Sequence, residues 1–137
     1  MLRAAVYTKG IQIYCTPTAD DRETWIPTMR HIAFEGRCFV LSACEYIRRG
    51  GYPAEYPAIQ EDDPQIVLTR GGSVIVNPLG RVMAGPDYSD EKILTADLDT
   101  GEIAEGKFDL DVVGHYARPD AFRLEVNEKA CSQDGVY

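Results

Sequence analysis

The chain has 137 residues, of which 45% are hydrophobic and 26% are charged, as expected for one soluble globular domain with a hydrophobic core. Its formal net charge of -8, from 22 acidic and 14 basic residues, would repel a phosphate backbone, so nucleic acid is not expected as a partner. No stretch approaches the roughly 18 apolar residues of a membrane span, and we expect a cytoplasmic protein with no membrane partner.

The first two predicted elements are a helix end and a short strand. Residues 1–9 read as the end of a helix, because Gly10 can take the left-handed conformation that closes one. Residues 11–15 then predict a strand. Pro17 follows that strand and ends it, since proline cannot donate to a sheet ladder.

A second helix and a buried strand are predicted next. Apolar residues recur at three- and four-residue intervals over residues 24–36 and predict a helix with Thr24 as its N-cap. The continuous apolar run at residues 38–44 predicts a strand covered on both faces. Residues 45–65 are polar and rich in glycine and proline, which predicts a long loop that could cover a cleft.

The remaining pattern predicts a hairpin, a strand and a helix. Residues 73–76 and 81–84 flank Asn77-Pro78-Leu79-Gly80, in which proline suits the second turn position and glycine the fourth. Residues 92–98 read as another strand. After a turn, residues 103–109 predict a short helix.

The chain offers poor material for a metal site. Its cysteines are Cys15, Cys38, Cys44 and Cys131. They show no C-x-x-C spacing, and His31 and His115 are the only histidines, so we expect no metal and no cofactor. We interpret the thiols as reduced and mostly structural. Cys15 stands at a strand end, where a nucleophile could sit, but no histidine or cation lies near it in the sequence to lower its pKa.

Four sequence blocks in a fixed order carry a family resemblance. They are GIQIYCTPTAD at residues 10–20, HIAFEGRCFV at 31–40, GGSVIVNPLG at 71–80 and VVGHYARPD at 112–120. Together they resemble nitrilases of the carbon-nitrogen hydrolase superfamily over residues 1 to 127. The Gly-His-Tyr-x-Arg-Pro run favours nitrilases over the amidase and carbamoylase branches.

The resemblance implies an α/β (α+β) fold, a four-layer α-β-β-α sandwich of which this chain supplies half. Residues 1–99 would be the C-terminal part of the hydrolase domain, and residues 100–137 a C-terminal extension of nitrilase type. The family's catalytic set is a glutamate, a lysine and a cysteine followed by Trp-Glu-Asn, and no Cys-Trp-Glu occurs in these residues. We therefore assign no catalytic residue here and expect all three to lie upstream of Met1.

The activity that the resemblance implies is the conversion of a small-molecule nitrile to a carboxylic acid and ammonia, through a cysteine thioimidate. The parent would be a homo-oligomer, and this chain alone would be inactive. The alternative is a non-catalytic interaction or oligomerisation fragment that binds intact nitrilase subunits through the helix at residues 24–36. Half of a sandwich leaves an apolar sheet face and strand edges in water, so we expect the isolated chain to be insoluble or oligomeric.

Candidate site residues follow from the same resemblance. The loop after the first strand lies near the substrate in the implied fold, so Thr16, Pro17 and Thr18 are expected to bind substrate and shape selectivity. Glu35 lies in a block where the family's base does not occur, and its expected role is helix pairing or capping. His115 and Arg118 could line a pocket or a subunit interface, although a lone histidine is more often structural.

Overall fold

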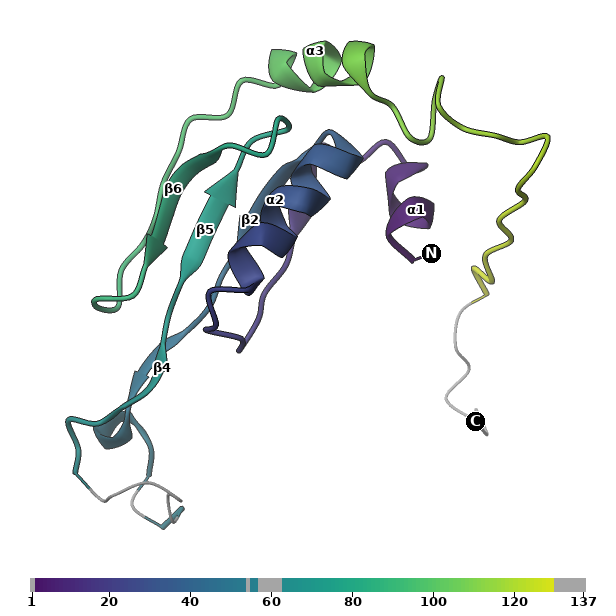
Figure 1. Cartoon of the computed structure of the whole chain (residues 1–137). Coiled ribbons are helices and arrows are strands. Elements are labelled where there is room, and N and C mark those ends of the chain that lie inside the picture. The colour runs from purple at the N-terminus through teal and green to yellow at the C-terminus, as the bar shows by residue number, and fades with distance from the viewer. Residues whose placement is uncertain (1, 54, 57–62, 130–137) are drawn as a thin grey trace.

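The computed structural model describes residues 2–53, 55–56 and 63–129. The elements in chain order are α1 (Leu2–Tyr7), β1 (Ile13–Cys15), α2 (Trp25–Gly36), β2 (Phe39–Ser42), β3 (Tyr46–Arg48), the 3-10 helix η1 (Arg49–Gly51), β4 (Val67–Arg70), β5 (Ser73–Val76), β6 (Val82–Asp87) and α3 (Gly101–Asp109). One sheet has the order β1-β2-β5-β6, and β3 and β4 form a separate ribbon that extends below it (Figure 1). The mixed α/β class is confirmed.

The core lies between α2 and one face of the four-stranded sheet. Met29, Ile32 and Ala33 recur along the helix at the predicted spacing and are buried against strand residues that include Val40 and Val76. Burial of this apolar stripe is the main stabilising contribution of the layer. The helix begins where the sequence predicts, with Thr24 at the N-cap, but the Thr24 side chain makes no capping hydrogen bond.

The sheet combines a parallel and two antiparallel pairings. β1 and β2 run parallel, whereas β2–β5 and β5–β6 are antiparallel. The turn between β5 and β6 is closed by hydrogen bonds from Asn77 N to Arg81 O and from Gly80 N to Asn77 O, each 2.9 Å long. The predicted hairpin is therefore confirmed, and so is the buried strand β2.

Two predictions of local structure were wrong. The segment 45–65 is not one long loop, because β3 pairs antiparallel with β4 in the register Tyr46↔Arg70 and Ile47↔Thr69; its residues 54 and 57–62 lie outside the described part of the chain. The segment 92–98 forms no strand. Its backbone makes no hydrogen bond to another described backbone group, and strand-like composition has little effect without a pairing partner.

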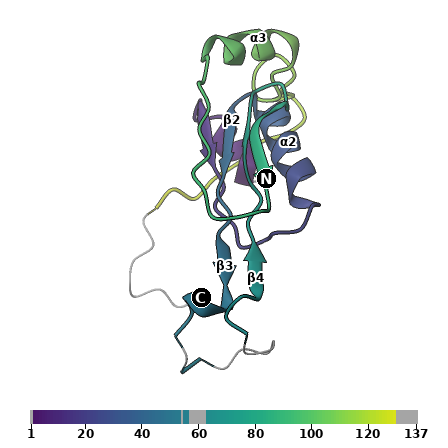
Figure 2. The ribbon, with the colours of Figure 1, turned by 90° about the vertical axis from the view of Figure 1, so that its left-hand side faces the viewer.

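The sheet face opposite α2 is more open. Cys15, Leu41 and Ile75 lie side by side across β1, β2 and β5 on that face. They line an apolar groove of about 460 Å³ that is bounded on its outer side by the segment Lys92–Leu94. Figure 2 shows this segment, in green, running along the sheet.

Gly85 is expected to be intolerant of a side chain. Its φ is 75°, and an added Cβ would collide with the carbonyl oxygen of Ser73, where the β5–β6 register shifts. We expect Gly85→Ala to lower the free energy of unfolding by about 1–3 kcal/mol, measured by urea denaturation. Gly51→Ala is the matched control, since no described residue beyond its chain neighbours and its own helical turn lies within 4 Å of the added Cβ, and equal losses from the two variants would refute this reading.

Candidate active-site groove

The loop that follows β1 runs beside the end of β2. The backbone N–H of Thr16 donates to Leu41 O, and that of Thr18 donates to Ala43 O, both at 2.9 Å. Thr18 also pairs with Cys44 as an isolated parallel bridge. The β1–β2 pairing therefore continues past both strands. It holds the loop beside the carboxyl ends of β1 and β2.

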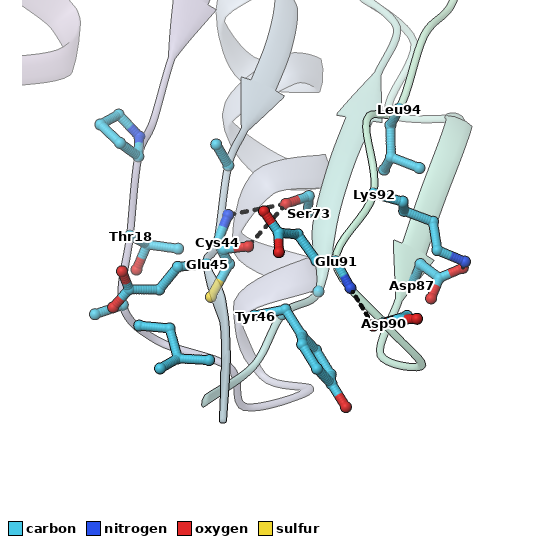
Figure 3. A pocket seen from close by; sticks show the side chains of 16 residues that line it. Thr18, Cys44, Glu45, Tyr46, Ser73, Asp87, Asp90, Glu91, Lys92 and Leu94 are labelled. Atoms are coloured by element: carbon cyan, nitrogen blue, oxygen red, sulfur yellow. Dashed lines mark hydrogen bonds and ion pairs between the residues drawn. The ribbon is translucent and has the colours of Figure 1, made fainter. Parts of the chain in front are cut away.

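An open groove of about 860 Å³ lies at this edge (Figure 3). Its lining includes Pro17, Thr18, Cys44, Glu45, Ser73 and Lys92. The three residues expected to bind substrate are therefore divided. Pro17 and Thr18 line the groove, whereas the Thr16 hydroxyl turns toward α2 and lies 3.0 Å from Met29 Sδ. Their contact with substrate stays a prediction.

Ser73 fastens the two sides of the groove and was missed by sequence reasoning. Its Oγ accepts a hydrogen bond from Cys44 N (2.9 Å) and donates one to Cys44 O (3.0 Å), as Figure 3 shows. The start of β5 is thus joined to the chain that leaves β2. The sequence feature that could have indicated a special backbone conformation here is the preceding Gly71-Gly72 pair. Both glycines have positive φ values, 81° and 103°.

Carboxylates outnumber cations along the groove. Glu45, Asp87, Asp90 and Glu91 line it together with one cation, Lys92. Lys92 Nζ donates to Asp87 Oδ2 at 2.6 Å, and this contact, with support from Ser89, holds the pKa of Asp87 well below its usual range. Lys92 is therefore already neutralised by a partner.

An arginine-centred contact fixes the loop before α2. Arg70, at the end of β4, donates from its backbone N–H to Asp21 Oδ2 and from its guanidinium to Asp21 O, at 3.0–3.1 Å. The same guanidinium lies 4.5 Å from the centroid of the Tyr88 ring. The β3–β4 ribbon is thereby fixed to the loop before α2, which sequence reasoning did not foresee.

The described thiols differ in exposure. Cys15 is exposed, whereas Cys38 and Cys44 are buried, and all three are free. Burial raises the pKa of the Cys38 thiol to about 11. Burial, followed by the carboxylates of Asp21 and Glu45, raises the pKa of the Cys44 thiol. Cys44 therefore lines the groove as a neutral thiol at pH 7; Cys131 lies outside the described residues.

The other three candidates lie away from the groove. Glu35 accepts hydrogen bonds from Arg3 Nε (3.3 Å) and Tyr7 OH (3.1 Å) and so connects α2 to α1. The His115 ring lies 4.7 Å from that of its neighbour Tyr116. Arg118 forms a bidentate pair with Asp120 at 2.7 and 2.8 Å on the surface. None of the three lines the groove, and an interface role for them stays a prediction.

The described residues contain neither a metal-binding cluster nor a membrane-spanning helix. Among residues 2–53, 55–56 and 63–129, no group of three or more histidine, cysteine, aspartate or glutamate side chains could hold a metal ion. In the same part of the chain, no helix has the length and apolar character to cross a membrane.

Comparison with known proteins decides the family. The sequence profile of the carbon-nitrogen hydrolase family matches residues 1–108. This chain belongs to the carbon-nitrogen hydrolase family. Its matched region contains every element of the groove, from the loop after β1 to the segment after β6.

The carbon-nitrogen hydrolase chain is similar to longer curated proteins. It is 62% identical over 129 residues to an aliphatic nitrilase of Sinorhizobium fredii (strain HH103), which covers 94% of this chain and 42% of that protein. It is 54% identical over 136 residues to the bifunctional nitrilase/nitrile hydratase NIT4B of Nicotiana tabacum, which covers 96% of this chain and 39% of that protein. The chain thus spans about two fifths of the length of these relatives.

A solved structure supports the fold. The crystal structure of the C. elegans NitFhit protein superposes with a TM-score of 0.64 at 23% identity, over 96% of this chain and 29% of that one. At this identity the likeness bears on fold alone. The expected α/β (α+β) class, as part of an α-β-β-α sandwich, is confirmed.

Proposed function

We propose that this chain forms the later part of a nitrilase, and that its groove contributes one wall of the pocket for a small nitrile. The proposal is carried by the identity of 62% over 129 residues to an aliphatic nitrilase. It is supported by the position of Pro17 and Thr18 at the carboxyl edge of the sheet, the edge at which open α/β sheets commonly bind ligands. The division at residue 99 and the nitrilase-type extension over residues 100–137, of which 130–137 lie outside the described part, belong to this proposal.

The chemistry follows from the resemblance to nitrilases. A thiolate would attack the nitrile carbon and form a thioimidate, water would add and ammonia would leave, and a second water would release the carboxylic acid and restore the thiol. A glutamate would move the protons, and a lysine ammonium would stabilise negative charge on nitrogen or oxygen. All three groups would come from polypeptide other than these 137 residues, since none of them matches a position here.

The described residues would act through shape and burial. The Ser73–Cys44 hydrogen bonds hold two walls of the groove at a constant separation, which favours one substrate orientation. The raised pKa of Cys44 keeps that thiol protonated, so it would not compete with the reacting thiolate. We also propose that the parent protein is a cytoplasmic homo-oligomer.

The test begins with the coding DNA before the Met1 codon. We expect a Cys-Trp-Glu codon run within a few codons of it, and we expect the joined polypeptide to release ammonia from aliphatic or arylacetonitrile substrates. Absence of that run in every reading frame would overturn the proposal. An inactive joined polypeptide that co-purifies with intact nitrilase subunits would instead favour the alternative, a non-catalytic interaction fragment.

A further inference from the structure

A buried hydroxyl contacts the loop that follows β1. Ser42 is the last residue of β2 and is 4% exposed. Its side chain lies on the α2 side of the sheet, because Val40, two residues earlier on the same strand, packs in the core against α2. Burial of a hydroxyl is costly unless it is hydrogen-bonded, so the partners of Ser42 show what it does there.

The hydroxyl of Ser42 joins a helix to the loop. Ser42 Oγ accepts a hydrogen bond from Trp25 Nε1 and donates one to Thr16 O, each 2.9 Å long. The indole fixes this direction, since its N–H can only donate. The hydroxyl therefore accepts from Trp25, and its own hydrogen is left for the carbonyl of Thr16. The first residue of α2 is thus connected through the end of β2 to the loop.

The carbonyl of Thr16 belongs to the peptide bond that leads into Pro17. Because proline has no N–H, this carbonyl is the only hydrogen-bonding group of that peptide. The other polar groups of Thr16 are also held, since its N–H donates to Leu41 O at 2.9 Å and its hydroxyl lies 3.0 Å from Met29 Sδ. Thr16 is therefore an anchor for Pro17 and Thr18, which line the open groove.

We propose that Ser42 is a positioning residue of the groove, whose hydroxyl holds the Thr16–Pro17 peptide and thereby sets where Pro17 and Thr18 meet a bound nitrile. The effect on a nitrile rests on the proposed function, whereas the anchoring of the loop does not. Ser42 does not itself line the open groove, so it acts through the loop. Without its hydroxyl, Thr16 O loses its donor and the loop can shift, which changes the shape of the groove wall.

Hydrogen exchange tests the anchoring in the 137-residue chain and needs neither activity nor a monomer. We expect Ser42→Ala to speed exchange of the Thr16 and Thr18 amides about tenfold, because the loop opens more often once Thr16 O has lost its donor. Ile32→Val is the matched control, since Ile32 is 5% exposed in the same core and has no polar side-chain group. Unchanged rates in Ser42→Ala, or equal acceleration by Ile32→Val, would overturn the proposal.

A second variant leaves Ser42 in place. Trp25→Phe removes the indole N–H that orients the hydroxyl, while Ser42 can still reach Thr16 O. We therefore expect a smaller acceleration of the same two amides, about threefold. This variant decides the matter should Ser42→Ala fail to fold, and an effect no larger than that of Ile32→Val would count against the role of Ser42.

Kinetics of the joined polypeptide test the effect on substrate. We expect Ser42→Ala to raise KM for a nitrile about fivefold with kcat changed less than about twofold, because the loop supplies shape and no reacting group. An unchanged KM, or the same rise in Ile32→Val, would overturn the effect of Ser42 on substrate. Inactivity of the unsubstituted joined polypeptide would count against the proposed function instead, and the exchange rates would then decide whether Ser42 anchors the loop.

Discussion

The 137-residue chain, purified by itself, is expected to release no ammonia from any nitrile above the buffer blank. Members of a catalytic set act as a unit, so that loss of one group costs nearly as much as loss of all. The sequence contains no Cys-Trp-Glu, and its groove contains a buried thiol, Cys44, whose pKa is raised. A protonated thiol is a poor nucleophile.

The controls for this assay concern Cys15, which is the exposed described thiol. Its Sγ makes no hydrogen bond or ion pair with another described residue, and Lys92, across the same apolar groove, is paired with Asp87. The Cys15→Ala chain should therefore release no more ammonia than the buffer blank, as the unchanged chain does. An intact nitrilase should be active in the same buffer. Turnover by the chain that disappears in Cys15→Ala would contradict the assignment of the reacting thiol to other polypeptide.

Replacement of Arg37 is expected to lower the free energy of unfolding more than Gly85→Ala or Arg30→Leu does. This side chain is 1% exposed and follows α2 with a positive φ of 47°. Its guanidinium donates to Pro78 O, Leu110 O and Asp109 Oδ2 at 3.1–3.4 Å. It also lies 4.1 Å from the centroid of the Phe34 ring. One buried cation thus joins α2 to the β5–β6 turn and to the end of α3.

We expect Arg37→Leu to lower the free energy of unfolding by about 3–5 kcal/mol, because it leaves two carbonyl oxygens without their donor and removes the cation–ring contact. Arg37→Lys should retain only part of the stabilisation that Arg37 provides, since an ammonium cannot reproduce the planar guanidinium fork. Urea denaturation measures both effects. Arg30→Leu is the matched control, because Arg30 is exposed and makes a single hydrogen bond, to Gly80 O in the same turn. Its expected cost is about 1 kcal/mol or less, and an equal cost at Arg37 would refute the argument.

Local patterns account for the elements that sequence predicted correctly. The spacing of Met29, Ile32 and Ala33 reports one helix face, and the Asn77–Gly80 turn is specified by four adjacent residues. Such signals involve contacts a few positions apart, which side-chain type alone determines. The same reasoning failed for residues 92–98, where the strand-like pattern meets no partner strand.

The sequence by itself determined the helix α2, the β5–β6 hairpin, the negative charge and the four blocks that resemble nitrilases. Only the tertiary structure decided that Pro17 and Thr18, but not Thr16, face the groove, that Ser73 fastens Cys44, and that Arg37 reaches Pro78 and Leu110. The physical reason is distance along the chain. These contacts join residues 13 to 73 positions apart, and their geometry depends on how whole elements pack, which no short sequence window contains.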